Sequence, residues 1–199
     1  MASSAASSPV LVVTGTSGAG KGSIERILLE RMPDLELAVS ATTRERRPSE
    51  LDGKHYWFLP AAEFDRKLAE KEFLEYVTFP WGQRSGTLRS EIDRIRAAGR
   101  IPLLDLETDG AMYVQEKVSE ALTIFVTAPT FEELERRLRA RATESSGEIE
   151  ERLALARQQL ALSDRFDHVI VNDDLHRAAE EVLEIVRGRI AAAGTMSAS

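Results

Sequence analysis

The sequence predicts an α/β fold in which a parallel β-sheet is flanked by helices. Five short apolar runs, at residues 10–13, 35–39, 101–106, 123–126 and 168–171, alternate with longer stretches of helical pattern. Short runs that are apolar throughout are typical of strands buried on both faces of a sheet. The stretches between them carry an apolar face, as in Ile24, Leu28 and Leu29, which is typical of helices that cover such a sheet.

Length and composition indicate one folded domain with a substantial core. The chain has 199 residues, of which 43% are hydrophobic, and its formal net charge is -7. An acidic chain lacks the basic surface by which proteins hold nucleic-acid phosphates, so we expect no nucleic-acid partner. The lack of cysteine fits a cytoplasmic protein, and no apolar run is long enough to span a membrane. Any anionic ligand must therefore be captured by a few local cations.

Changes in pattern divide the chain into a core, an inserted module and two tails. Between residues 42 and 89 the apolar runs become short and aromatic, at 56–58 and 73–76, and Pro, Gly and Asp separate them. This pattern predicts a small, partly β module inserted into a core formed by residues 10–41 and 90–190. The small and polar residues at 1–9 and 191–199 predict disordered tails.

A glycine-rich loop between the first strand and the first helix is the strongest signal. The segment GTSGAGKGS at residues 15–23 has the spacing and the strand-to-helix context of a phosphate-binding loop, or P-loop. Its backbone amides and the helix dipole can hold phosphates, and its lysine can reach the β and γ oxygens. An ordinary glycine-rich turn is the alternative. The expected contacts with a nucleoside triphosphate come from Gly15, Ser17, Gly18, Ala19, Gly20, Lys21, Gly22 and Ser23.

A magnesium ion is expected with the triphosphate. Gly22 replaces the usual Ser or Thr after the P-loop lysine, so the nearest hydroxyl group is that of Ser23. A second candidate is Asp105, because a carboxylate at the end of a buried parallel strand lies beside the phosphate loop. Ser23 and Asp105 are therefore the candidate metal contacts, with phosphate and water supplying most ligands. A capping or surface role is the alternative for Asp105.

A cluster of hydroxyl and guanidinium groups follows the second apolar run. Residues 40–47 have the sequence SATTRERR, in which Arg44 and Arg47 lie three apart. A planar guanidinium group can bind phosphate through two hydrogen bonds, so this pair can hold a second, acceptor phosphate. A solvated turn is the alternative. Together with the P-loop, the cluster predicts a phosphotransferase.

The order of these motifs resembles that of the guanylate kinase family of P-loop nucleoside monophosphate kinases. The likeness runs from about residue 10 to residue 186, through GTSGAGKGS, SATTRERRPSELDGKHYWF, EFLEYVTFPWGQRSGT, PLLDLETDGA, EELERRLRARATESS and HVIVNDDL. It implies a P-loop NTPase core, a GMP-binding module at residues 42–89 and a lid at about 136–152. It also implies transfer of the γ-phosphoryl group of ATP to GMP with Mg2+. We expect ATP and GMP as ligands and a monomer or homodimer.

The resemblance also implies roles for residues of the acceptor site. Arg44 and Arg47 match the arginines that bind the acceptor phosphate, and Tyr56 matches a tyrosine that assists them. A carboxylate such as Glu75 suits guanine, because guanine offers N1–H and a 2-amino group on one edge whereas adenine does not. The other candidate contacts with the acceptor are Ser40, Glu50, Ser85, Thr87, Asp105 and Glu107.

Cationic side chains and one asparagine complete the implied site. The lid arginines can neutralise charge on the transferring phosphoryl group. Surface pairs with glutamate are the alternative for them and the preferred interpretation for Arg136 and Arg139. Asn172 matches the family's contact with adenine, with a helix N-cap as its alternative. The catalytic candidates are Lys21, Arg44, Arg137, Arg141 and Arg152.

The sequence departs from the family beside the acceptor site. Ser85 replaces the tyrosine of the usual Tyr-Gly-Thr, which removes one phenolic contact and leaves Arg84 as a candidate substitute. A kinase of another acceptor, such as dGMP or another nucleoside monophosphate, is therefore one rival function. The other rival is a guanylate-kinase-like module that binds proteins, although such a module is expected to have lost the P-loop.

Overall fold

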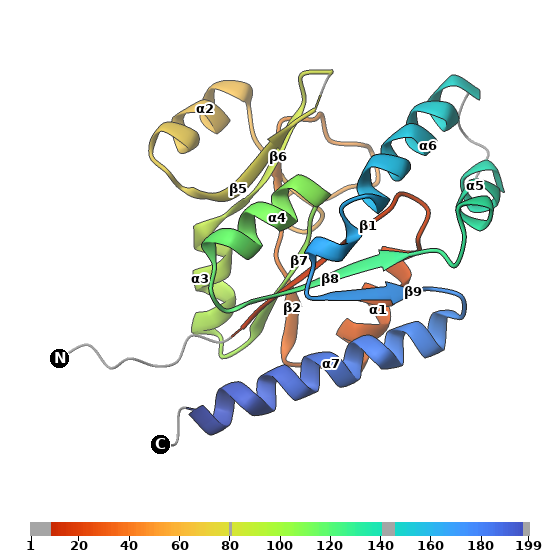
Figure 1. Ribbon diagram of the computed structural model, residues 1–199. Coiled ribbons are helices and arrows are strands. Elements are labelled where there is room, and N and C mark those ends of the chain that lie inside the picture. The colour runs from red at the N-terminus through yellow and green to blue at the C-terminus, as the bar shows by residue number, and fades with distance from the viewer. Residues whose placement is uncertain (1–8, 80, 141–145, 197–199) are drawn as a thin grey trace.

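A parallel five-stranded sheet forms the centre of the molecule (Figure 1). The computed structural model describes residues 9–79, 81–140 and 146–196. Hydrogen-bonded neighbours follow the order β2-β7-β1-β8-β9, and every neighbouring pair is parallel. The strands lie at the five predicted apolar runs, which confirms the predicted parallel sheet. Their bounds are Val10–Gly15 for β1, Leu35–Leu37 for β2, Ile101–Asp105 for β7, Ala121–Thr127 for β8 and His168–Val171 for β9.

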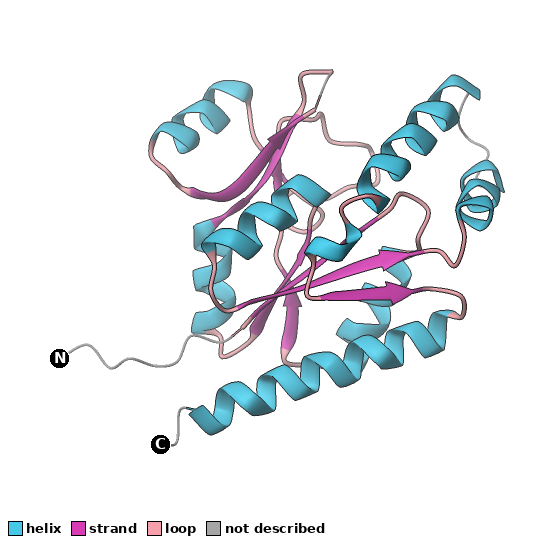
Figure 2. Ribbon diagram, in the orientation of Figure 1, coloured by secondary structure: helices cyan, strands magenta, loops and turns pink. Residues whose placement is uncertain are grey.

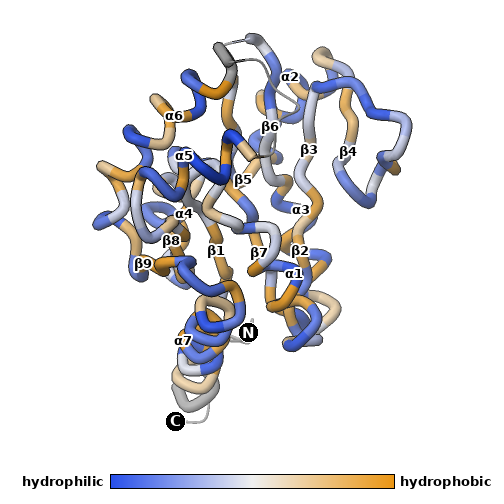
Figure 3. The backbone as a smooth tube through the Cα atoms, turned by 90° about the vertical axis from the view of Figure 1, so that its right-hand side faces the viewer, coloured by the Kyte–Doolittle hydropathy of each residue, from blue (hydrophilic) through white to orange (hydrophobic). Residues whose placement is uncertain are grey.

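Helices cover both faces of this sheet, as the ribbon in Figure 2 shows. Side chains alternate along β1, so Leu11 and Val13 pack against α1 (Lys21–Arg31) and α7 (Leu175–Met196). Val10 and Val12 point to the other face and pack against α3 (Arg89–Ala97) and α4 (Thr108–Lys117). In Figure 3 the hydrophobic segments accordingly gather at the central sheet, while α5 is largely hydrophilic. Burial on both faces explains why these strands are continuous apolar runs.

A second sheet gives the inserted module its own small core. Its strands follow the order β4-β3-β6-β5, and α2 (Ala61–Ala69) packs on them through Phe64. The ring of Phe64 lies 4.3 Å from that of Phe73, measured between centroids. The extent of the module as a domain stays a prediction. The strands are β3 (Ala41–Thr42), β4 (Trp57–Phe58), β5 (Phe73–Thr78) and β6 (Arg84–Leu88).

Two helices with a separate apolar cluster lie where the lid is predicted. They are α5 (Phe131–Ala140) and α6 (Ser146–Leu160), and a short 3-10 helix, η1 (Ser163–Arg165), follows them. Leu134 and Leu138 of α5 pack against Leu153 and Ala156 of α6. The pair is thus one packed unit, joined to the core at the end of β8 and, through η1, at the start of β9.

The C-terminal helix corrects one sequence prediction. Residues 191–199 were expected to form a disordered tail, but α7 continues to Met196. Three consecutive alanines at 191–193 explain the extension, since alanine has the highest helix propensity. The remaining tail residues, 1–8 and 197–199, lie outside the described residues. Among the helices that the structure describes, none is long and apolar enough to cross a membrane.

Candidate functional site

The P-loop connects the carboxyl end of β1 to the start of α1, beside the ends of β7 and β8. Gly15, Gly18 and Gly20 have φ angles of 144°, 85° and 91°, which L-residues with a Cβ rarely adopt. A Cβ on Gly15 would lie 2.0 Å from the backbone oxygen of Val126 in β8. Glycine is therefore required at residue 15 for the loop to leave the sheet at this angle.

Replacing Gly15 with alanine is expected to destabilise the fold by about 3 kcal/mol or more, because both φ and the contact with Val126 become unfavourable. Thermal unfolding followed by circular dichroism should show a melting temperature lower by about 6 to 12 °C. Gly188→Ala is the matched control, because Gly188 lies within α7 and a Cβ there meets no atom within 4 Å. Equal melting temperatures for the Gly15 variant and the unchanged protein would contradict the described loop geometry.

Two elements brace the P-loop from outside. The side-chain Nδ2 of Asn172 donates to the backbone oxygen of Ala19 at 2.7 Å, and Asn172 is buried. The backbone oxygen of Asn172 in turn accepts from Nη2 of Arg137 at 3.0 Å. Leu138 of α5 lies 3.1 Å from the position of a Cβ on Gly18, so α5 packs directly on the loop. Asn172 therefore positions the loop, and its contact with adenine stays a prediction.

Asp174, rather than Asn172, caps the helix that follows. Its carboxylate accepts from the backbone N–H of Arg177 at 2.9 Å, at the first turn of α7. The alternative of an N-cap role for Asn172 is therefore not what the structure shows.

Lys21 forms an ion pair with Asp105 across the mouth of the loop. Its Nζ lies 3.1 Å from Oδ1 of Asp105, which ends β7. Burial lowers the pKa of Lys21, but the charges of Asp105 and Glu107 and the hydrogen bond to Asp105 outweigh it and raise this pKa above its usual value. The lysine is thus charged and held by a carboxylate that an incoming phosphate can replace. The sequence predicts both residues at this site, whereas their pairing is visible only in the structure.

Glu25 is a third carboxylate near this ion pair, and sequence analysis missed it. The residue is 6% exposed, and among the described residues its Oε1 has no hydrogen-bond partner. Burial and the charge of Asp105 raise the pKa of Glu25 to about 8, although Lys21 opposes them. The available signal was an acid beside Ile24, four residues after the P-loop lysine, in the apolar face of α1.

The donor set fits a magnesium ion that is held mainly by phosphate and water. Asp105 offers a carboxylate whose side chain is 46% exposed, and Glu25 offers a buried oxygen without a partner. Ser23 lies in the first turn of α1. Among the residues that the structure describes, no group of three acidic or histidine side chains could hold a metal ion by itself. Mg2+ prefers oxygen ligands and keeps several waters, which suits such a site.

Arg44 is held in a fixed orientation within the inserted module. Its Nη1 and Nη2 donate to Oε2 and Oε1 of Glu50 at 3.0 and 2.7 Å. The guanidinium carbon lies 5.4 and 5.6 Å from the ring centroids of Tyr56 and Phe58. Hydrogen bonds from Arg44 and from the backbone N–H of Arg47 lower the pKa of Glu50 to about 2. Glu50 therefore positions Arg44, and its direct contact with substrate stays a prediction.

Ser85, which stands where the family has a tyrosine, and its neighbour Arg84 both form hydrogen bonds within the inserted module. The hydroxyl of Ser85 donates to the backbone oxygen of Ala41 at 3.1 Å. The guanidinium of Arg84 pairs with Asp65 of α2 and lies 4.7 Å from the ring centroid of Phe64. Arg84 thus stabilises the packing of α2, and the structure does not support it as a substitute for the tyrosine.

Glu75 lies at the junction between the module and the core. It is buried, and its Oε1 accepts from the backbone N–H of Thr87 at 2.8 Å. A Cβ on Gly110 of α4 would lie 2.7 Å from Oε2 of Glu75, so glycine leaves room for this carboxylate. Burial raises the pKa of Glu75, although the hydrogen bonds with Thr87 oppose it. The role of Gly110 depends on tertiary contact, and in the sequence Gly110 stands out only as the glycine of the PLLDLETDGA stretch.

Two of the other predicted contacts with the acceptor, Glu107 and Ser40, lie outside the strands. Glu107 is exposed at the start of α4, and its Oε2 accepts from Nε2 of Gln159 at 3.4 Å. Gln159 belongs to the part of α6 that lies beyond the predicted lid, and the sequence pattern does not predict its bond with Glu107. Ser40 lies between β2 and β3, where its backbone oxygen accepts from Trp57.

The predicted lid arginines have different surroundings. Arg137 pairs with Glu133 at 2.7 Å in addition to its bond with Asn172, so it lies close to the P-loop. Arg136 pairs with the same Glu133 and Arg139 pairs with Glu135, which confirms them as surface pairs. Two further candidates are placed differently: Arg152 is half-buried on α6, and Arg141 lies outside the described residues.

Comparisons with a family model, with curated sequences and with a solved structure all match this chain to guanylate kinases. The family model described as guanylate kinase matches residues 7–189. The chain is 44% identical over 182 residues to the guanylate kinase of Prochlorococcus marinus, covering 92% of this chain and 96% of that protein. It is 44% identical over 185 residues to the guanylate kinase of Rubrobacter xylanophilus, with 93% and 96% covered. The crystal structure of guanylate kinase from Anaplasma phagocytophilum matches with a TM-score of 0.74 and 27% identity, over 93% of this chain and 87% of that one.

Proposed function

Because the chain belongs to the guanylate kinase family, we propose that it transfers the γ-phosphoryl group of ATP to GMP and releases ADP and GDP. The observation that carries the proposal is that the P-loop holds Lys21 at its mouth while the inserted module holds Arg44 in one orientation. Lys21 pairs with Asp105 at 3.1 Å, whereas Arg44 pairs with Glu50 and rests on the ring of Tyr56. Burial, and after it the charge of Asp105, raise the pKa of Tyr56. We infer from these two held cations that the P-loop binds the donor and the module binds the acceptor.

Positioning and charge neutralisation would supply most of the catalysis. An oxygen of the GMP phosphate attacks the γ-phosphorus, the bond to the β–γ bridging oxygen breaks, and ADP leaves. The P-loop amides and Lys21 hold the donor, while Arg44 and Arg47, with Tyr56, hold the acceptor. The arginines that neutralise the transferring group are Arg137, Arg141 and Arg152. No protein nucleophile is required.

The other predicted site residues would bind Mg2+ and the adenine and guanine bases. Mg2+ would add positive charge at the β and γ phosphates, held by Asp105 and Ser23 largely through water. Asn172 would contact adenine. Guanine would be contacted by Ser40, Glu75, Thr87 and Glu107. We assign these contacts to a module at residues 42–89 and a core at 10–41 and 90–190, with a lid at about 136–152, in a cytoplasmic monomer or homodimer.

An acceptor panel tests this function directly. ADP release is coupled to NADH oxidation at fixed ATP and Mg2+, with GMP, dGMP, AMP, CMP and UMP compared at equal concentration. We expect GMP to give the largest kcat/KM. A larger value for dGMP would support the rival acceptor, and no ADP release with any of the five would refute the kinase assignment.

Replacing Glu75 with glutamine is expected to lower kcat/KM for GMP by about 10-fold to 100-fold, since a charged acceptor for guanine N–H groups is lost. The value for AMP should stay unchanged or rise, because adenine has no N1–H or 2-amino group to pair with the carboxylate. Glu70→Gln, at an exposed position at the end of α2, is the control. If kcat/KM fell equally for GMP and AMP, Glu75 would instead have a structural role in the packing of β5 against α4.

A further inference from the structure

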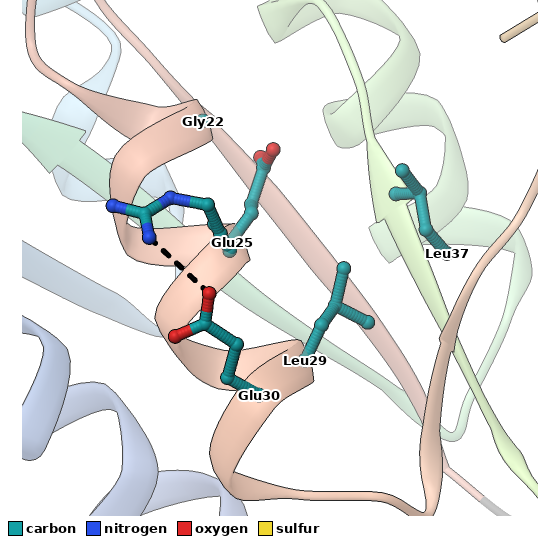
Figure 4. Close-up of a pocket in the computed structure, with 6 residues that line it drawn as sticks. Gly22, Glu25, Leu29, Glu30 and Leu37 are labelled. Atoms are coloured by element: carbon teal, nitrogen blue, oxygen red, sulfur yellow. Dashed lines mark hydrogen bonds and ion pairs between the residues drawn. The ribbon is translucent and has the colours of Figure 1, made fainter.

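Gly22 and Glu25 line one groove on α1, next to the P-loop (Figure 4). The groove has a volume of about 400 Å³ and is otherwise lined by Arg26, Leu29, Glu30 and Leu37. In Figure 4 the carboxylate of Glu25 points toward the start of α1, where Gly22 lies. Glu30 instead pairs with Arg26, at 3.2 Å from its Nη1. Glu25 is thus the carboxylate of this groove that is directed at the phosphate-binding end.

The chain lacks a side chain where P-loops ordinarily supply a metal ligand. The residue after the lysine usually has a hydroxyl group that binds Mg2+, but here it is Gly22. A Cβ on Gly22 would meet no atom within 4 Å, so the space for that side chain is open. Glu25 follows three residues later and therefore lies on the same face of the helix, one turn away. Its long side chain can reach toward the space that the missing hydroxyl would fill.

Charge and burial give Glu25 a reason to bind a cation. Its Oε1 is buried without a hydrogen-bond partner among the described residues, which is unfavourable for a polar atom. The electrostatic neighbours that act on Glu25 are Asp105 and Lys21. When Lys21 moves from Asp105 to the donor phosphates, Asp105 and Glu25 lose their shared counterion beside the added negative charge of the phosphates. A divalent cation between them restores the balance of charge.

We propose that Glu25 serves, beside Ser23, as an outer ligand of the nucleotide-bound Mg2+, reached through a water of the ion's shell, and so compensates for the hydroxyl that Gly22 lacks. This inference rests on the proposed ATP-dependent function. A water-mediated ligand agrees with the reluctance of Mg2+ to lose its water shell. It also agrees with the fact that, in the described part of the chain, no group of three acidic or histidine side chains could hold a metal directly.

Calorimetric titration of Mg2+ into protein saturated with a non-hydrolysable ATP analogue tests the proposal. All titrations are made in the same buffer at one pH, so that the variants differ only in the substituted side chain. Glu25→Gln keeps the shape of the side chain and removes its charge, and we expect a Kd for Mg2+ weaker by about 10-fold to 100-fold. Glu30→Gln, in the same groove but paired with Arg26, should leave this Kd unchanged.

Two further measurements separate metal binding from a structural role. In EDTA, Glu25→Gln should bind the ATP analogue as tightly as the unchanged protein. Adding Gly22→Ser to Glu25→Gln should recover most of the lost Mg2+ affinity, since it restores the hydroxyl in open space. An unchanged Kd for Mg2+ in Glu25→Gln, or equal weakening with and without metal, would overturn the inference. If the unchanged protein fails to bind the ATP analogue at all, the proposed function itself fails.

Discussion

Replacing Lys21 with methionine is expected to lower kcat for phosphoryl transfer to GMP by about 10³-fold. The lysine is the cation that the structure places at the mouth of the P-loop, 3.1 Å from Asp105. Methionine has a similar length but no charge, so the developing negative charge on the β and γ phosphates would lose its nearest protein donor. It would also leave Asp105 without its partner, and that carboxylate would repel the incoming triphosphate.

Steady-state kinetics with GMP and Mg-ATP measure this effect, and Lys117→Met is the control. Lys117 ends α4 and pairs with the neighbouring Glu116 at an exposed position, so its removal should leave kcat unchanged. The melting temperature of Lys21→Met should stay close to that of the unchanged protein. A kcat within about 10-fold of the unchanged value would mean that the loop does not act on the reacting phosphates.

Replacing Arg44 with lysine is expected to lower kcat/KM for GMP by about 100-fold or more, mainly through a higher KM for GMP. A lysine keeps the positive charge, but it cannot bond Glu50 through two nitrogens and present further donors to a phosphate at the same time. It also loses the planar group that rests on Tyr56 and Phe58. The charge would therefore no longer be held in one place.

The matched control is Arg66→Lys on α2, where the guanidinium pairs with Glu70 at an exposed position. We expect the KM for ATP to change little in Arg44→Lys, because the donor loop is intact. If the KM for GMP stays unchanged while that for ATP rises, Arg44 acts on the donor, and the assignment of donor and acceptor sites must be exchanged.

The sequence pattern predicts the five strands of the central sheet and the P-loop, because each depends on the residues within its own segment. The five buried strands are continuous apolar runs because helices cover both faces of their sheet, and the P-loop needs glycine where φ is positive. In contrast, β3 has only two residues and exists through its pairing with β4 and β6. Strands of that kind have no periodicity to detect.

The missed parts of the site depend on contacts between distant segments. Glu25 falls within the apolar face of α1, but only the packing of that helix shows it to be a buried carboxylate near Asp105. Gly110 matters because α4 approaches Glu75 closely, and Gln159 because α6 ends near Glu107. Arg84 was expected near the acceptor, but α2 offers it Asp65 and the ring of Phe64. None of these partners is a neighbour in sequence.

Titration with a bisubstrate analogue, in which a chain of phosphates joins adenosine to guanosine, tests the central claim most directly. If Lys21 and Arg44 hold two nucleotides in one site, the analogue binds far more tightly than ATP or GMP alone, because the second contact becomes intramolecular. Lys21→Met and Arg44→Lys should each remove most of that gain. An analogue that binds no more tightly than the better of the two nucleotides would show that the donor and the acceptor do not meet as described.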